Sequence, residues 1–135
     1  MTPASEPTKR RDLSARREAI TQKVRIGGQR TLYVSVHNDP HPAELFFRIK
    51  GKDCTSEIIN LFDVLARISS KALQYGMPLE ELGELLYQTK CEPAGVVQHH
   101  ARIRNCTSLT DYIGRHLLIE YCGRDDLAHV TEATG

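Results

Sequence analysis

Apolar and polar residues alternate along the chain from Thr21 to about residue 50. A period of two residues is typical of strands with one buried face, so this part predicts three antiparallel strands. Gly27 and Gly28 can supply the positive φ angles of a tight hairpin, and the run from Asn38 to Pro42 interrupts the second connection. The buried face should consist of Val24, Ile26, Leu32, Val34, Val36, Leu45, Phe47 and Ile49.

After Gly51 the apolar spacing lengthens to that of a helix. Asp53, Thr55 or Ser56 can cap the start of this first helix, and Gly76 can take the left-handed conformation that ends it. Its inward-facing stripe consists of Ile58, Phe62, Leu65, Ser69 and Ala72. Leu61 and Ile68 lie beside this stripe.

Two more helices follow by the same reasoning. Pro78 suits the first turn of a second helix that ends near Gln88. A third helix begins at Thr107 or Ser108 and stops before Gly123. Its inward positions are Leu109, Ile113, Leu117 and Tyr121.

The stretch 90–106 is rich in breaker residues and is interpreted as a loop or one short strand. The predicted fold is therefore α+β, with a three-stranded antiparallel meander packed against about three helices. We expect a single domain over residues 19–130, preceded by a flexible basic arm over 1–18 and followed by a flexible tail over 131–135.

Composition supports one globular domain, because the 135 residues are 40% hydrophobic and 26% charged. The formal net charge is +1, so attraction to nucleic acid would need a local patch. No apolar run approaches the roughly 20 residues of a membrane helix, and no signal peptide is evident, so we expect a cytoplasmic protein. Cys54, Cys91, Cys106 and Cys122 are widely spaced, which indicates reduced thiols.

The strand surface opposite the apolar one is the first candidate site. Cations pair with phosphate and aromatic rings stack on bases, so together they suit a nucleotide or single-stranded nucleic acid. An ordinary solvated face, or one covered by a partner subunit, explains the same pattern. The residues that alternation places on this surface are Lys23, Arg25, Tyr33, Phe46, Arg48 and Lys50.

The start of the third helix is the second candidate site. Ser108 and Asp111 have the spacing of a capping box, in which the hydroxyl accepts from a first-turn amide and the carboxylate reaches back. The same helix terminus can also hold a phosphate, with Arg115 one turn further on, although Asp111 would oppose an anion.

Other candidate chemistry has less support. Zinc ligands usually come in pairs about two to four residues apart, a spacing that Cys91, His99, His100, Cys106 and Cys122 do not show. The arginines between residues 9 and 17 are interspersed with acids, so nucleic-acid binding is not expected. No nucleophile is paired with a base, and we expect no catalytic residue, metal or cofactor.

Several blocks carry a resemblance to a known family. They are Arg16-Arg17 with Thr21–Gly28, Leu73–Glu81, Glu92–Val97, Thr107–Ile113 and Gly123–Val130. In this order they resemble the C-terminal TSCPD domain of cobalamin-dependent (class II) ribonucleotide reductases. Leu109 and Thr110 stand where the motif has its cysteine and proline, so a thiol or metal role of that cysteine does not transfer.

The resemblance implies a role linked to nucleotides. In that family a catalytic barrel precedes the domain and a cysteine-containing tail typically follows it, so we expect an autonomous domain rather than a self-sufficient reductase. Three hypotheses follow: a non-catalytic nucleotide-binding or regulatory module beside a ribonucleotide reductase, a phage-encoded sponge that sequesters a nucleotide signal in anti-defence, and a split reductase subunit. The half-covered sheet also suggests a homodimer or higher homo-oligomer.

Overall fold

The computed structural model describes residues 9–88 and 95–130, and it confirms the α+β class. Residues 1–8 of the predicted arm (1–18) and the whole predicted tail (131–135) lie outside the described residues. The elements in chain order are β1 (Glu18–Ile26), β2 (Arg30–Asn38), β3 (Pro42–Gly51), α1 (Ser56–Gln74), α2 (Leu79–Leu86), β4 (Gly95–Gln98), β5 (Asn105–Cys106), α3 (Leu109–Tyr121) and the 3₁₀ turn η1 (Asp125–Leu127).

The strands form one antiparallel sheet in the order β3-β2-β1-β4-β5. The predicted meander is confirmed, with Gly27 at φ 65° and Gly28 at φ 71° in the first hairpin. The interpretation of 90–106 as a loop or one short strand needs correction, because two short strands there extend the sheet to five. Strand β4 joins the sheet where Val97, itself buried, pairs with Ile26.

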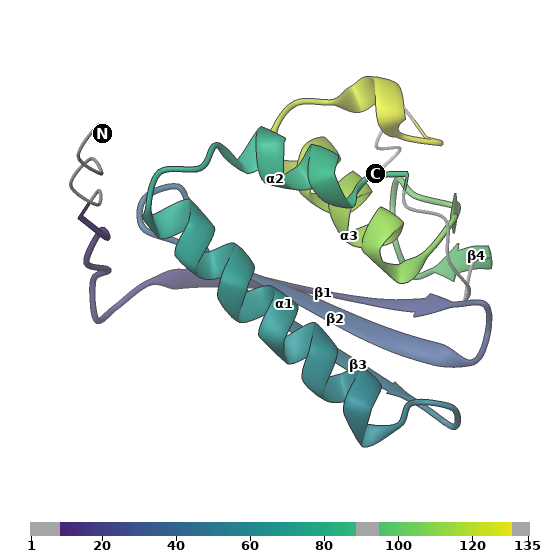
Figure 1. Ribbon diagram of the computed structural model, residues 1–135. Coiled ribbons are helices and arrows are strands. Elements are labelled where there is room, and N and C mark those ends of the chain that lie inside the picture. Colours follow the sequence, from purple (N-terminus) through teal and green to yellow (C-terminus); the bar gives the residue numbers. More distant parts are fainter. Residues whose placement is uncertain (1–8, 89–94, 131–135) are drawn as a thin grey trace, which may run out of the picture.

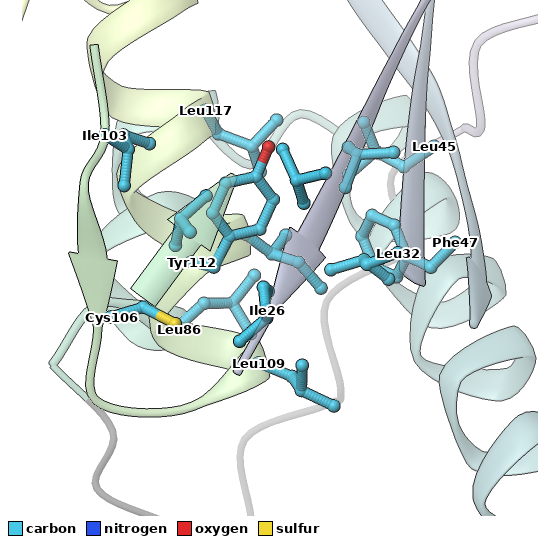
Figure 2. Close-up of a cluster of buried hydrophobic side chains, with 14 of the residues drawn as sticks. Ile26, Leu32, Leu45, Phe47, Leu86, Ile103, Cys106, Leu109, Tyr112 and Leu117 are labelled. Carbon is cyan, nitrogen blue, oxygen red and sulfur yellow. The ribbon is translucent and has the colours of Figure 1, made fainter. Parts of the chain in front are cut away.

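The three α-helices cover one face of the sheet and leave the other uncovered (Figure 1). The alternating apolar residues of β1, β2 and β3 are buried against them, as predicted. Tyr112 of α3 is fully buried, and its ring lies in the middle of the core cluster (Figure 2). Of the residues predicted to face inward on α3, Leu109, Ile113 and Leu117 are buried and Tyr121 is half-buried.

Helix α1 is capped as its sequence predicts, because the Thr55 hydroxyl accepts from the Ile58 amide at 3.3 Å. Gly76 follows the helix at φ 108°. Leu61 and Ile68 do not reach the core and are 57% and 62% exposed. Among the described residues, no helix is both long enough and apolar enough to cross a bilayer.

Helix α1 also closes half of the free edge of β3. The Ser70 hydroxyl accepts from the Leu45 amide at 2.8 Å and lies 3.1 Å from the Leu45 carbonyl oxygen. The Gln74 amide donates to the Ala43 carbonyl oxygen at 3.1 Å. Because these side chains satisfy the strand's outward backbone groups, a further strand cannot pair with this half of β3.

Residues 9–17 run beside the end of α1 before β1 begins. The Arg11 amide donates to the Gln74 carbonyl oxygen at 3.0 Å, and the Ser14 amide donates to Asp39 at 2.6 Å. Arg17 forms an ion pair with Glu44 at 2.8 Å. The domain boundary between residues 18 and 19 stays a prediction.

Candidate functional site

The uncovered face of the sheet carries the six strand residues that alternation predicts for it. In the register of the sheet, Tyr33 of β2 pairs with Lys23 of β1 on one side and Arg48 of β3 on the other. Two residues along, Thr31 pairs with Arg25 and Lys50. Paired residues in neighbouring strands project from the same face. The open face is defined here by the side chains of Thr21, Lys23, Arg25, Thr31, Tyr33, Ser35, Phe46, Arg48 and Lys50.

Two of the four cations of the open face lie near one aromatic ring. The Nζ atoms of Lys23 and Lys50 lie 5.9 and 5.3 Å from the centroid of the Tyr33 ring. Lys23, Arg25, Arg48 and Lys50 are all exposed. Within the described part of the chain, none of the four forms an ion pair with a carboxylate. Four neighbouring positive charges thus remain without a neutralising partner from the fold.

A groove of about 680 Å³ opens beside these cations. Its strand side consists of Thr21, Tyr33, Ser35, Phe46, Phe47 and Arg48. Its helix side consists of Ser56, Ile59, Asn60 and Asp63, from the first half of α1. Among the described residues, the side chains of α1 that hydrogen-bond to the edge of β3 are Ser70 and Gln74, which belong to its second half. The first half makes no such bond and leaves room for the groove. The Phe46 side chain is 46% exposed, so a planar ligand can stack on its ring.

Ser108 and Arg115 lie in a separate cluster at the start of α3. Together with Asp111 and Gln88 they form what is named here the Asp111 cluster. The Ser108 hydroxyl accepts from the Asp111 amide at 2.8 Å, which confirms the predicted cap. The fully buried Asp111 carboxylate accepts from the amides of Gln88 at 2.6 Å and Thr107 at 2.9 Å. It also pairs with the Arg115 guanidinium at 3.0 Å.

Close packing of α2 and α3 brings the end of α2 to Asp111. A Cβ atom on Gly114 would lie 2.7 Å from the Gly83 carbonyl oxygen, so only glycine allows this approach. Arg115 also donates to the Leu127 carbonyl oxygen at 3.1 Å and lies over the Tyr87 ring at 4.9 Å. Its side chain is 13% exposed. The structure therefore does not bring Ser108 and Arg115 together with the open face, and both are occupied by contacts within the fold.

Comparison with known proteins places this arrangement in a family. The family model described as the TSCPD domain matches residues 6–121, which is most of the chain. The chain belongs to the TSCPD domain family. Its TSCPD domain is 40% identical over 123 residues to a vitamin B12-dependent ribonucleotide reductase of Agrobacterium fabrum, a match that covers 90% of this chain and 9% of that enzyme.

Two further relatives have the same description. The vitamin B12-dependent ribonucleotide reductase of Bradyrhizobium diazoefficiens is 37% identical, over 90% of this chain and 10% of that enzyme. The one from Rhodopirellula baltica is 31% identical, over 92% of this chain and 12% of that enzyme. The chain thus spans about a tenth of the length of these relatives. No solved structure matches it.

The TSCPD domain also contains a histidine cluster, formed by the buried His100 and His116 and the exposed Glu120. His100 Nε2 lies 3.0 Å from His116 Nδ1 and 3.8 Å from a Glu120 carboxylate oxygen. Burial and the nearby Arg102 charge lower the pKa of His100 to about 4. Burial and the neighbouring His100 lower the pKa of His116 to about 3. Both imidazoles are therefore neutral at pH 7.

The ligand atoms of the histidine cluster lie within 4.8 Å of one another, a spacing that could hold a metal ion. The hydrogen bonds argue otherwise. His100 Nδ1 accepts from the amides of Arg102 at 3.0 Å and Ile103 at 3.1 Å, so the neutral ring carries its proton on Nε2. A metal on Nε2 would require the proton on Nδ1, facing two other donors. The cluster is better suited to hold β4 and its following loop against α3.

The cysteines do not join the histidines. Cys91 lies outside the described residues, and Cys54, Cys106 and Cys122 are free. Burial, followed by the Asp111 charge, raises the pKa of the Cys106 thiol to about 11. His99 is exposed while its neighbour His100 is buried, so their side chains diverge. Protonated thiols are poor metal ligands and weak nucleophiles.

Sequence reasoning missed the helix side of the groove. Ser56, Asn60 and Asp63 recur at the spacing of one helix face, and this polar face was a usable signal. What the sequence does not contain is the placement of that face beside β3, which depends on the hydrogen bonds of Ser70 and Gln74 further along α1.

Proposed function

We propose that this TSCPD domain is a non-catalytic module that binds a nucleotide or nucleotide-derived ligand on the open face, in a regulatory or accessory role linked to ribonucleotide reductase. The observation that carries the proposal is the group of four unneutralised cations on the open face, two of them near the Tyr33 ring, next to a groove lined by aromatic residues. Cations supply charge-assisted hydrogen bonds to phosphate, and exposed rings supply stacking surfaces for a base.

The order of residues along the open face suits a nucleoside phosphate. Thr21, Ser35 and Phe46 pair across the three strands, and Lys23, Tyr33 and Arg48 form the next set. Adjacent sets are two residues apart, or about 7 Å along the strand. A base on Phe46 would therefore place its sugar beside Tyr33 and its phosphates near Lys23, Lys50 and Arg25.

Isothermal titration of the purified domain against nucleoside di- and triphosphates, cyclic dinucleotides and ADP-ribose tests the proposal. The double variant Lys23→Ala/Lys50→Ala should weaken binding of the best ligand by at least about tenfold, because two charge-assisted contacts are lost. The matched control Lys9→Ala/Lys71→Ala removes the same net charge from exposed positions elsewhere and should retain the affinity. No heat of binding with any of these ligands would refute the proposal.

The relation to ribonucleotide reductase needs a second measurement. A regulatory module and a nucleotide sponge both predict binding by the isolated domain, whereas a split subunit predicts a complex with a reductase chain. Size-exclusion chromatography with light scattering, with and without such a chain, separates the split subunit from the other two alternatives and also tests the predicted homo-oligomer. The cytoplasmic location stays a prediction.

A further inference from the structure

The groove beside the open face is lined by two opposite charges from two different elements. Arg48 lies on its strand side and Asp63 on its helix side. Arg48 has no ion-pair partner among the described residues. Asp63 is held by Arg67 one turn along α1, with Nε 3.2 Å from Oδ2, and remains 57% exposed. A carboxylate oxygen can accept more than one hydrogen bond, so Asp63 still has free acceptor capacity toward the groove.

This pair of charges matches the two edges of guanine. Guanine has two neighbouring acceptors, O6 and N7, which an arginine guanidinium recognises in a bidentate manner. Its Watson–Crick edge has two neighbouring donors, the N1–H and the 2-amino group, which a carboxylate can accept because it is an acceptor only. Adenine lacks both arrangements, since its 6-amino donor lies between two ring-nitrogen acceptors. A carboxylate facing adenine N1 would place two acceptors against each other.

We propose that the groove selects guanine over adenine, with Arg48 binding the O6/N7 edge and Asp63 binding the N1–H and 2-amino edge. This inference rests on the proposed function, because it assigns the base of the nucleotide whose phosphates the open face binds. Phe46, which also lines the groove and is exposed, supplies the surface on which the base stacks. The Asn60 amide can pair with either purine, so it adds affinity without selecting one.

Titration of the intact domain with GDP, ADP and IDP tests the selection. GDP should bind at least about tenfold more tightly than ADP, because one good bidentate contact already gives about that ratio. IDP keeps O6, N7 and N1–H but lacks the 2-amino group, so its affinity should lie between the two. Equal affinity for GDP and ADP would overturn the selection and leave the proposed function intact. No binding of any of the three would overturn the selection, and the proposed function would be overturned only if the wider ligand set also failed to bind.

The variant Asp63→Asn isolates the helix wall. It should reduce GDP affinity severalfold without weakening ADP, because adenine cannot make the carboxylate contact, and the Arg48 contact should keep the rest of the GDP preference. Glu57→Gln is the matched control, since it removes an exposed carboxylate of α1 that does not line the groove, and it should keep the GDP preference. A GDP-to-ADP ratio that is unchanged in Asp63→Asn would refute the inference, and circular dichroism confirms that both variants are folded.

Discussion

Arg115 in α3 and Arg48 in β3 carry the same charge in two regions of the domain that use it differently. Arg115 is 13% exposed, pairs with a fully buried carboxylate and donates to the Leu127 carbonyl oxygen. Arg48 is exposed, lines a groove and forms no ion pair with a carboxylate within the described residues. The first arginine holds elements of the fold together, and the second is available to a ligand.

The difference follows from the cost of burying charge. A buried carboxylate is tolerated only when charged or polar donors surround it, and Asp111 has such donors from Gln88, Thr107 and Arg115. An exposed cation costs little, so nothing in the fold needs to neutralise Arg48. The block of the family motif around Ser108 and Asp111 therefore lies where the chain stabilises its own fold. Much of the candidate binding surface lies on β2 and β3, outside the blocks that carry the resemblance.

Breaking the Asp111 cluster should have the largest effect. Asp111→Asn keeps the size of the side chain but leaves Arg115 partly buried without its counter-charge, and it removes an anionic acceptor from the Gln88 amide. We expect a loss of about 3–5 kcal/mol in the free energy of unfolding, measured by urea denaturation. Asp63→Asn, which removes an exposed ion pair with Arg67, should change it by less than about 1 kcal/mol. Equal midpoints for the two variants would contradict the structural role of Asp111.

Acid should destabilise the domain through the histidine cluster. The pKa values of His100 and His116 fall from 6.5 to about 4 and about 3 on folding, so the unfolded chain binds more protons between these values. The contribution of the two neutral histidines to the free energy of unfolding is therefore fully present above pH 6.5. It is lost as the pH falls toward 4 and 3, by at most about 1.4 kcal/mol per pH unit for each histidine.

Urea midpoints measured between pH 7 and pH 5 test this, since that range lies above the titration of ordinary carboxyl groups. His100→Gln should reduce the slope of stability against pH. His99→Gln changes an exposed neighbour and should keep the slope of the unmodified domain. A free energy of unfolding that does not vary over this range would show that the buried histidines do not govern the acid response.

Local patterns predicted the strands, the first hairpin and the Ser108 cap, because alternation and capping depend on residues close in sequence. Strands β4 and β5 contain four and two residues, which is too few for a period to be recognised. The contact between His100 and His116 spans 16 residues and depends on how β4 and α3 pack. Such contacts are set by tertiary packing, for which the sequence has no local signal.

The same limit applies to the candidate site. Alternation placed Arg48 and Lys50 on the open face, and the sheet register bears this out. The sequence could not show that Asn60 and Asp63 of α1 lie beside that face. The position of α1 relative to β3 depends on the hydrogen bonds of Ser70 and Gln74, which join residues far apart in the sequence. Half of the groove was therefore accessible to sequence reasoning, and its function stays a proposal.

The smallest effect on stability should come from the open face. Arg48→Ala should change the free energy of unfolding by no more than about 0.5 kcal/mol, since an exposed arginine without an ion-pair partner contributes little to folding. Arg115→Ala is the comparison, because it leaves the buried Asp111 carboxylate without its cation and should be strongly destabilising. Parallel urea titrations of the two variants measure the difference directly. If Arg48→Ala destabilised the domain as much as Arg115→Ala, Arg48 would be a structural residue, and the open face would lose its main argument as a binding surface.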